Sequence, residues 1–438
     1  MRLLCQFESI YYIACGEFLV AVDYNKSADT KYFNFSSGSG SQIVSVTLSA
    51  NGEYVFGAFA NKYICCWDTS TGAVLGSFLH SKRPTAFVCM ESEMMNTAKK
   101  VMSLVISDKS GLIWGTDVPN FRKQVLLAGH TASVITDMTT DSSLIATADR
   151  DEKVRISNFP RMDTLQAFCM GHTNVVTSIT FVKFESETLL VSCGWDHKLC
   201  LWNHKNGHNY DILQYDTSSS DHSRLIADST SSVLAAAENV FEDAKLDILS
   251  SEGSTVGDLK ELAADEAEEL AEKSYDEDIA GQYPVKVVAT VSSSLVAVVF
   301  KNCPYVKIYS IVKGGKNGIS SFCFGEEVLV TLPAVPSDVC FSSDGDLLVL
   351  LPKPSYIQLF SVSLTTSQSG DCSASIQVNG YSDTHQIISA FQGLCIEKGV
   401  NFSQQLVSTV DGEDAEKGEL HFYISLIFCG NSFVPSPT

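Results

Sequence analysis

Short strands and turns recur along this chain in the same layout at an almost constant interval. The strings DRDEKVRISN and GWDHKLCLWN align with Asp151 on Asp196, a step of 45 residues. The Gly-His dipeptides at 129–130 and 171–172 are 42 residues apart. Steps of about 40–45 residues are typical of four-stranded blades repeated around a central axis. The repeat therefore predicts an all-β propeller.

Turn signals between short apolar runs support this fold class. Residues 44–78 hold four strand-like runs, with Asn51-Gly52 and Thr71-Gly72 at turns between them. The strand rhythm continues after residue 282, although the Gly-His marks are lost there. We predict seven blades, with the strands of residues 1–36 and the last segment forming one closing blade. Ring closure would remove the open sheet edges.

Four residues of the repeat that starts at Gly171 can satisfy one another inside a blade. His172 precedes the first strand, and the others fall on the second and third strands. Buried polar groups must be paired, so we expect a structural hydrogen-bonded chain rather than a reactive site. The predicted members are His172, Ser192, Asp196 and Trp202, with His130 and Asp151 in the same roles one repeat earlier.

An acidic stretch interrupts the repeats. Residues 209–280 contain 19 Asp or Glu and 4 Lys or Arg, so they carry most of the formal net charge of −21. We predict a largely flexible insertion at 209–281 with one marginal helix at 257–273. An acidic peptide that docks on a basic partner is the alternative. The predicted organisation is first blades at 1–208, second blades at 282–410, and a tail or last strand at 411–438.

The remaining composition excludes several function classes. The chain lacks the glycine-rich phosphate loop of nucleotide-binding proteins and the Gly-x-Ser-x-Gly elbow of hydrolases. We expect no metal site at His204 and His208, because a polar hairpin does not place them on one face. No apolar run approaches the ~20 residues of a membrane span, and we interpret the N-terminus as mature protein. The 14 cysteines fit buried reduced thiols.

Three cations surround one turn of this acidic chain. Arg150, Lys153 and Arg155 lie in the string IATADRDEKVRIS, where a blade needs only apolar residues at Val154 and Ile156. On a strand, Lys153 and Arg155 project to the side opposite those apolar residues. The spacing alone leaves two interpretations open, a solvated strand face or a patch that binds carboxylates of another protein.

The motifs indicate two levels of resemblance, first to a broad family and then to a narrower one. Trp67-Asp68 and the Gly-His dipeptides are similar to those of WD-repeat proteins. The strings ISDKSG, ATADRDEKVRIS and GHTNVVTSI resemble the non-catalytic WD-repeat subunit of the eukaryotic tRNA (guanine-N(7)-)-methyltransferase. That resemblance implies a non-enzymatic, stabilising subunit of a heterodimer whose Rossmann-fold partner binds S-adenosylmethionine and forms 7-methylguanosine in the tRNA variable loop.

The resemblance also implies a site and a compartment. Lys153 and Arg155, and more weakly Arg150, would contact acidic residues of the catalytic subunit. tRNA would be bound mainly through that partner. This chain would bind no cofactor and contact no membrane. It would be located in the nucleus and secondarily in the cytoplasm. The chain departs from basic-tailed relatives, since it ends in NSFVPSPT. This puts direct tRNA contact by its C-terminus in doubt.

Two other function classes remain as alternatives. A WD-repeat adaptor of a ubiquitin ligase often carries Trp-Asp-x-Arg at the end of a third strand. The matching strings here, WDTS at 67–70 and WNHK at 202–205, lack the arginine. A propeller enzyme would need carboxylates or histidines converging on the innermost strands, and the strings VSVTLSA, VTSITFV and SDVCFSS offer almost none.

Overall fold

The computed structural model of this chain is an all-β structure. It describes residues 2–23, 30–35, 41–93, 100–130, 133–141, 143–215, 283–291, 293–314, 321–352, 356–366 and 374–381. Within these ranges no helix is long and apolar enough to cross a bilayer. The chain divides into a propeller unit, residues 1–213 with 284–438, and a second unit at 214–283.

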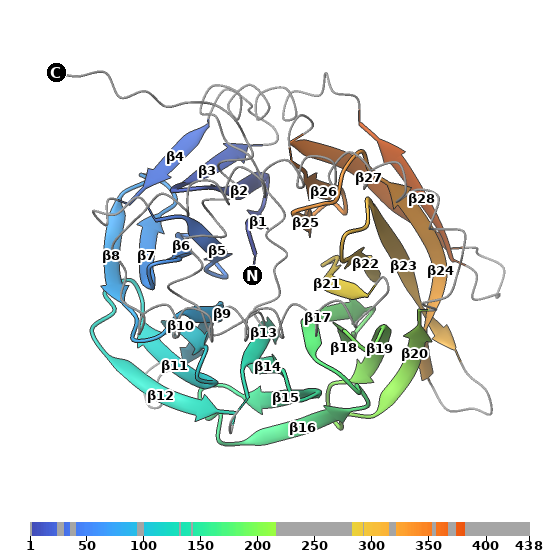
Figure 1. The fold of residues 1–438 in the computed structure, drawn as a ribbon, viewed down its shortest axis with the longest axis horizontal. Helices are drawn as coiled ribbons and strands as arrows, with labels where there is room; N and C mark the ends of the chain where they lie inside the picture. Colours follow the sequence, from blue (N-terminus) through green and yellow to red (C-terminus); the bar gives the residue numbers. More distant parts are fainter. Residues whose placement is uncertain are drawn as a thin grey trace, which may run out of the picture. The chain divides into compact units, whose positions relative to one another are not determined.

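The propeller unit contains seven four-stranded antiparallel sheets, here numbered blades 1 to 7 in chain order (Figure 1). Blade 1 consists of β1 (Leu4–Phe7), β2 (Ile10–Cys15), β3 (Phe18–Asp23) and β4 (Lys31–Asn34). Blade 2 consists of β5 (Ile43–Leu48), β6 (Tyr54–Phe59), β7 (Tyr63–Asp68) and β8 (Val74–Leu79). Blade 3 consists of β9 (Pro84–Glu93), β10 (Lys100–Asp108), β11 (Leu112–Asp117) and β12 (Gln124–Gly129).

Blade 4 consists of β13 (Ile135–Asp141), β14 (Leu144–Asp149), β15 (Lys153–Asn158) and β16 (Leu165–Met170). Blade 5 consists of β17 (Val176–Phe184), β18 (Glu187–Gly194), β19 (Lys198–Asn203) and β20 (Asn209–Gln214). Blade 6 consists of β21 (Pro284–Ala289), β22 (Leu295–Phe300), β23 (Tyr305–Gly314) and β24 (Ser321–Thr331). Blade 7 consists of β25 (Asp338–Phe341), β26 (Leu347–Leu350), β27 (Ile357–Thr366) and β28 (Ala374–Gly380). The predicted seven-bladed propeller is confirmed.

The position of a strand in its blade sets its burial. All six residues of β22 are buried, because this strand has a neighbouring strand on each side and a neighbouring blade on each face. The outermost strands alternate instead, as in β16, where Ala167 and Cys169 are buried while Phe168 and Met170 are exposed. The outermost strands therefore carry the side chains that remain available to partners.

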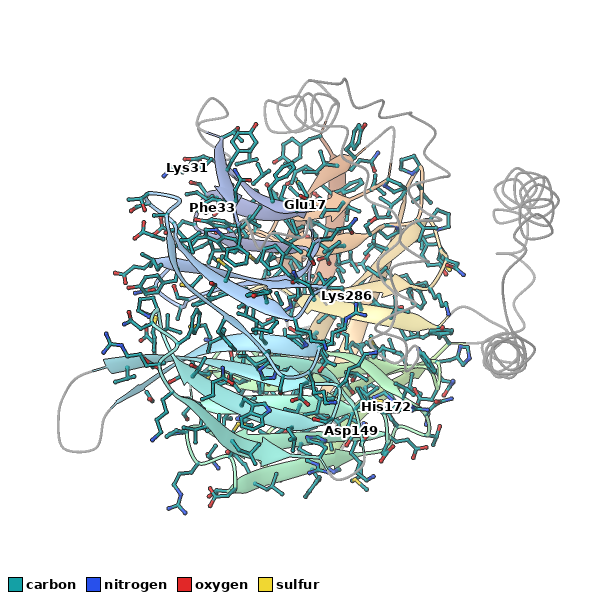
Figure 2. The ribbon with its side chains drawn as sticks, turned by 60° about the vertical axis from the view of Figure 1, so that its left-hand side comes forward. Glu17, Lys31, Phe33, Asp149, His172 and Lys286 are labelled. Atoms are coloured by element: carbon teal, nitrogen blue, oxygen red, sulfur yellow. The ribbon has the colours of Figure 1, made fainter. Side chains whose placement is uncertain are left out.

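The ring closes between complete blades, which differs from our prediction. β1 to β4 form the whole of blade 1, so no strand from the C-terminal segment is needed there. β1 contacts both β5 and β25, which joins the first and last blades. The Asp338 carboxylate accepts hydrogen bonds from the backbone N–H groups of Leu3 and Leu4, at 2.6 and 3.1 Å. It also pairs with the ammonium of the buried Lys286 of blade 6. Figure 2 labels Lys286.

The boundary predicted at residue 209 is also wrong. Residues 209–214 form β20, the outermost strand of blade 5, although their polar sequence resembles the acidic stretch that follows. Cross-strand pairing on the exposed edge of a blade tolerates such polar side chains. The helix predicted at 257–273, the part of the predicted second blades after residue 381 and the tail at 411–438 lie outside the described residues.

Candidate functional site

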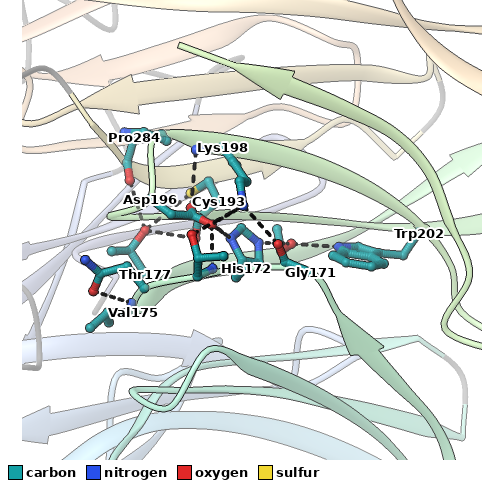
Figure 3. A network of polar contacts seen from close by, with 12 residues as sticks. Gly171, His172, Val175, Thr177, Cys193, Asp196, Lys198, Trp202 and Pro284 are labelled. Carbon is teal, nitrogen blue, oxygen red and sulfur yellow. Dashed lines mark hydrogen bonds and ion pairs between the residues drawn. The ribbon is translucent and has the colours of Figure 1, made fainter. Parts of the chain in front are cut away.

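Blade 5 holds a complete chain of buried polar side chains (Figure 3). His172 Nδ1 lies 3.0 Å from the Asp196 carboxylate, and His172 Nε2 lies 2.7 Å from Ser192 Oγ. The Trp202 indole N–H donates to the same Ser192 oxygen at 2.7 Å. A carboxylate only accepts, so Nδ1 carries a proton and donates to Asp196. The four residues predicted for this network lie together, and each is satisfied by another.

Asp196 is held as a carboxylate at the end of this chain. Burial, the largest single influence, would raise its pKa, but the hydrogen bond and charge of His172, the Thr173 N–H and the Lys198 ammonium together keep the pKa of Asp196 below its usual range. The Lys198 ammonium adds an ion pair at 3.4 Å. Lys198 Nζ also donates to the Gly171 carbonyl at 3.0 Å and to the Thr173 hydroxyl at 3.3 Å. This cation is therefore used entirely within its own blade.

Blade 4 has the same network with one different carboxylate. His130 Nδ1 lies 2.9 Å from Asp149 Oδ2, and His130 Nε2 lies 2.9 Å from Thr147 Oγ1. Asp149 is fully buried (Figure 2), whereas Asp151, which we predicted for this role, is exposed in the turn. The histidine was placed correctly, and its carboxylate partner was not.

The residue two positions before the aligned aspartate explains why the two blades use different carboxylates. Residue 149 of blade 4 corresponds to Gly194 of blade 5. A Cβ atom on Gly194 would lie 3.1 Å from the Asp196 carboxylate and 3.2 Å from His172 Nδ1. Glycine leaves this space open for Asp196 to fold back from the turn. In blade 4 the side chain of Asp149 occupies that space directly, because it starts there, and Asp151 is left outside.

Arg155 is a partly buried cation with spare hydrogen-bond donors. Its guanidinium lies over the Phe168 ring, with Cζ 5.7 Å from the ring centroid. Nη1 makes a long contact of 3.5 Å with the Gly129 carbonyl, and Nη2 lies 4.0 Å from the Asp149 carboxylate. Among the described residues the buried Nε has no hydrogen-bond partner, and the side chain is 24% exposed. A guanidinium has five N–H donors, so terminal N–H groups on Nη1 and Nη2 remain for a partner.

The other two predicted cations differ in how they are held. Lys153 corresponds to Lys198 in blade 5, but within the part of the chain that the structure describes its ammonium donates only to the Asp151 carbonyl, at 3.1 Å. Arg150 is exposed, and its backbone N–H donates to the Val134 carbonyl at 3.0 Å. The turn also exposes the carboxylates Asp151 and Glu152, so the cationic character lies on β15 rather than in the turn.

Three residues of this site were missed in the sequence. Asp149 anchors His130, Thr147 takes the place that Ser192 has in blade 5, and Phe168 supports Arg155. The 45-residue step itself places Thr147 on Ser192, so the repeat contained that signal. Phe168 could be found only from the pairing of β15 with β16.

Comparison with known proteins connects this region to one family. Residues 114–249 match the family model described as the tRNA methyltransferase TRM82 WD40 domain. The chain is 30% identical over 203 residues to the human tRNA (guanine-N(7)-)-methyltransferase non-catalytic subunit WDR4, covering 46% of each chain. The chain resembles the non-catalytic subunits of tRNA (guanine-N(7)-)-methyltransferase. The predicted resemblance is confirmed.

Two further relatives agree with this resemblance. TRM82 of Saccharomyces cerevisiae is 30% identical over 149 residues, which cover 32% of this chain and 31% of the yeast protein. The Dictyostelium discoideum subunit wdr4 is 25% identical over 212 residues, covering 41% of this chain and 42% of the relative. The chain thus matches less than half the length of these curated relatives.

Solved structures support the fold alone. A chain of the structure described as the mitotic checkpoint complex aligns with a TM-score of 0.52 at 13% identity, over 80% of this chain and 86% of that chain. The structure of U3-55K aligns with a TM-score of 0.51 at 14% identity, over 78% and 84% of the two chains. Both identities are too low to carry function from one protein to the other.

Proposed function

We propose that this chain is the non-catalytic subunit of a methyltransferase complex that forms 7-methylguanosine in the variable loop of tRNA. In this proposal a Rossmann-fold catalytic subunit binds S-adenosylmethionine and the tRNA, while this chain contributes no reacting group. The likeness to WDR4 and TRM82 supports the proposal, and the match to the TRM82 WD40 family model at residues 114–249 includes blade 4, which carries the three cations. We propose the nucleus as its main compartment.

The state of Arg155 is the observation that carries the partner assignment. A half-buried guanidinium with free N–H donors is suited to a carboxylate, which can accept two parallel hydrogen bonds from it. The Phe168 ring and the nearby Asp149 carboxylate hold Arg155 in position before binding, which lowers the entropic cost of association. The Lys153 ammonium, which donates to the Asp151 carbonyl, adds a second charge on the same strand face.

The proposed mechanism is stabilisation of one arrangement of the catalytic subunit. A rigid propeller that binds only the tRNA-competent arrangement raises its population, by an amount set by the difference in affinity for the two arrangements. Truncation of one member of a desolvated cation–carboxylate pair costs about 2–5 kcal/mol of binding free energy. Loss of these contacts should therefore reduce methylation by separating the subunits.

A methylation assay tests the proposal. Unmodified tRNA transcripts are incubated with labelled S-adenosylmethionine and the cognate catalytic subunit, with and without this chain. We expect no activity from this chain alone and a clear gain when both subunits are present. If the catalytic subunit is equally active alone and the two chains do not co-elute, the proposal is wrong, and the ubiquitin-ligase adaptor becomes the better hypothesis.

Charge-changing variants test the surface. Lys153→Glu and Arg155→Gln should abolish co-purification and the gain in methylation. Arg161→Glu is the matched control, because Arg161 is a 72% exposed cation of the same blade that pairs with its neighbour Asp163. Equal thermal melting of all variants shows that the propeller is intact. If the double variant Lys153→Glu and Arg155→Gln co-purifies with the catalytic subunit as well as the wild type does, these two cations do not form the interface.

A further inference from the structure

Apolar side chains on β16 lie directly beside the two cations of β15. In the register of this antiparallel pair, Lys153 is opposite Met170 and Arg155 is opposite Phe168. Directly opposed residues of neighbouring strands project to the same face of a sheet. Blade 4 therefore presents a block of two cations and two apolar side chains, and we call these four residues the β15–β16 block.

The apolar half of this block is exposed. Met170 is 62% and Phe168 is 41% exposed, although alternation on β16 buries the intervening Cys169 in the core. Isolated exposed apolar residues are common on protein surfaces. Here the two lie in register with cations that have few partners of their own, and Arg155 covers part of the Phe168 ring.

Blade 5 shows that the block is not a requirement of the fold. The positions corresponding to Arg155 and Ser157 are Cys200 and Trp202, both completely buried in the core that blades 4 and 5 share. In blade 4 the tryptophan is replaced by a buried serine, and the arginine side chain extends toward the outer strand. This places a charge where the third strand of the next blade has closed apolar packing.

We propose that the β15–β16 block is a two-part docking surface for a segment of the catalytic subunit in which a carboxylate is flanked by an apolar side chain. This inference rests on the proposed function and specifies the partner's chemistry at the same site. The carboxylate binds between Arg155 and Lys153, and the apolar side chain packs on Met170 and the free part of the Phe168 ring. Two features support this occupant. The two cations complement the charge of a carboxylate, and Met170 and Phe168 lie directly beside them.

The two halves of the surface differ in their response to salt. Contacts between exposed charges weaken as ionic strength rises, because the Debye length falls from about 10 Å at 0.1 M to about 3 Å at 1 M. Burial of Met170 against an apolar partner is not screened in this way. Affinity measured at two salt concentrations therefore separates an apolar contribution from an ionic one.

The experiment measures the dissociation constant between the full chain and the purified catalytic subunit at 0.1 and 0.5 M salt. Met170→Ala should raise it about tenfold at both concentrations, as expected for a central interface contact. Leu79→Ala is the matched control, since Leu79 is a 57% exposed residue of the outermost strand of blade 2. Phe168→Leu, which keeps apolar volume but removes the ring beneath Arg155, should also weaken binding.

The outcomes separate this inference from the proposed function. Wild-type affinity for Met170→Ala, together with weakened binding of Lys153→Glu, overturns the apolar half and leaves the proposed function in place. Equal loss of affinity for Met170→Ala and Leu79→Ala also overturns it, because the effect would not be local to blade 4. No measurable binding by the wild-type chain overturns both proposals.

Discussion

Blades 4 and 5 share a turn geometry, but their aligned lysines differ in how many contacts they make within their own blade. In both, the residue two positions after the aligned aspartate is a lysine, and the residue between them has a positive φ, 70° for Glu152 and 59° for His197. In blade 5, Lys198 is bonded to three groups of its own blade. In blade 4, Lys153 bonds one carbonyl. A structural repeat thus becomes a candidate binding surface when its internal partners are replaced.

The replacement of tryptophan by serine is the clearest structural difference. Trp202 is completely buried and donates to Ser192, while the corresponding Ser157 is a small buried side chain. The comparison therefore predicts that blade 5 stabilises the propeller more than blade 4 does at this position. The following predictions test this comparison from the largest expected effect to the smallest.

Trp202→Ala should cause the largest loss of stability. Removal of a buried tryptophan typically costs about 3–5 kcal/mol of unfolding free energy, and Ser192 also loses its donor. Ser157→Ala in blade 4 should change the unfolding free energy by less than about 1 kcal/mol. Urea denaturation of the two variants measures both values. Similar losses would mean that the two positions contribute equally and that the comparison fails.

Asp149→Ala should destabilise the chain more than Asp151→Ala. The first variant leaves the buried His130 ring and the Lys153 N–H without their acceptor, at a cost of about 1–3 kcal/mol. The second removes an exposed side chain, with an expected effect within about 0.5 kcal/mol. Denaturation midpoints compare them. A larger effect of Asp151→Ala would restore the sequence alignment as the better guide to the network.

Asp196→Asn should make stability less dependent on pH. The folded-state pKa of Asp196 is depressed, so its carboxylate stabilises the fold above its ordinary pKa of about 4, and that contribution is lost as pH falls through the folded-state pKa. Asp149, with a pKa depressed in the same direction, is the blade 4 counterpart. Unfolding free energies measured from pH 7 to 3 should fall less steeply for Asp196→Asn than for the wild type. Parallel curves would contradict this assignment.

Lys198→Met should slightly lower stability, whereas Lys153→Met should weaken binding of the partner. Lys198→Met removes an ion pair and two hydrogen bonds, so stability should fall by about 0–1 kcal/mol without loss of partner binding. Lys153→Met should leave stability unchanged and weaken binding of the catalytic subunit. Thermal melting and co-purification of both variants separate these effects. Loss of binding by Lys198→Met alone would place the interface on blade 5.

Local sequence patterns predicted much of this structure. The 45-residue step, the turn residues and the apolar runs predicted a seven-bladed propeller, and the positions of His172, Ser192, Asp196 and Trp202 predicted their contact. These features depend on period-two alternation and on the pairing of neighbouring strands. The prediction of a shared closing blade was wrong. Residues 1–36 contain all four strands of a blade, but some of these strands are short and weakly marked in the sequence.

The sequence by itself determined the repeat, the fold class and the residues that distinguish β15 from its counterpart in blade 5. Only the tertiary structure decided which carboxylate His130 contacts, because that depends on a side chain filling space that Gly194 leaves open in the next blade. It also decided that Arg155 lies over Phe168 and that Met170 stands beside Lys153. Such contacts join residues of different strands, and their register is set by packing across the sheet rather than by sequence spacing.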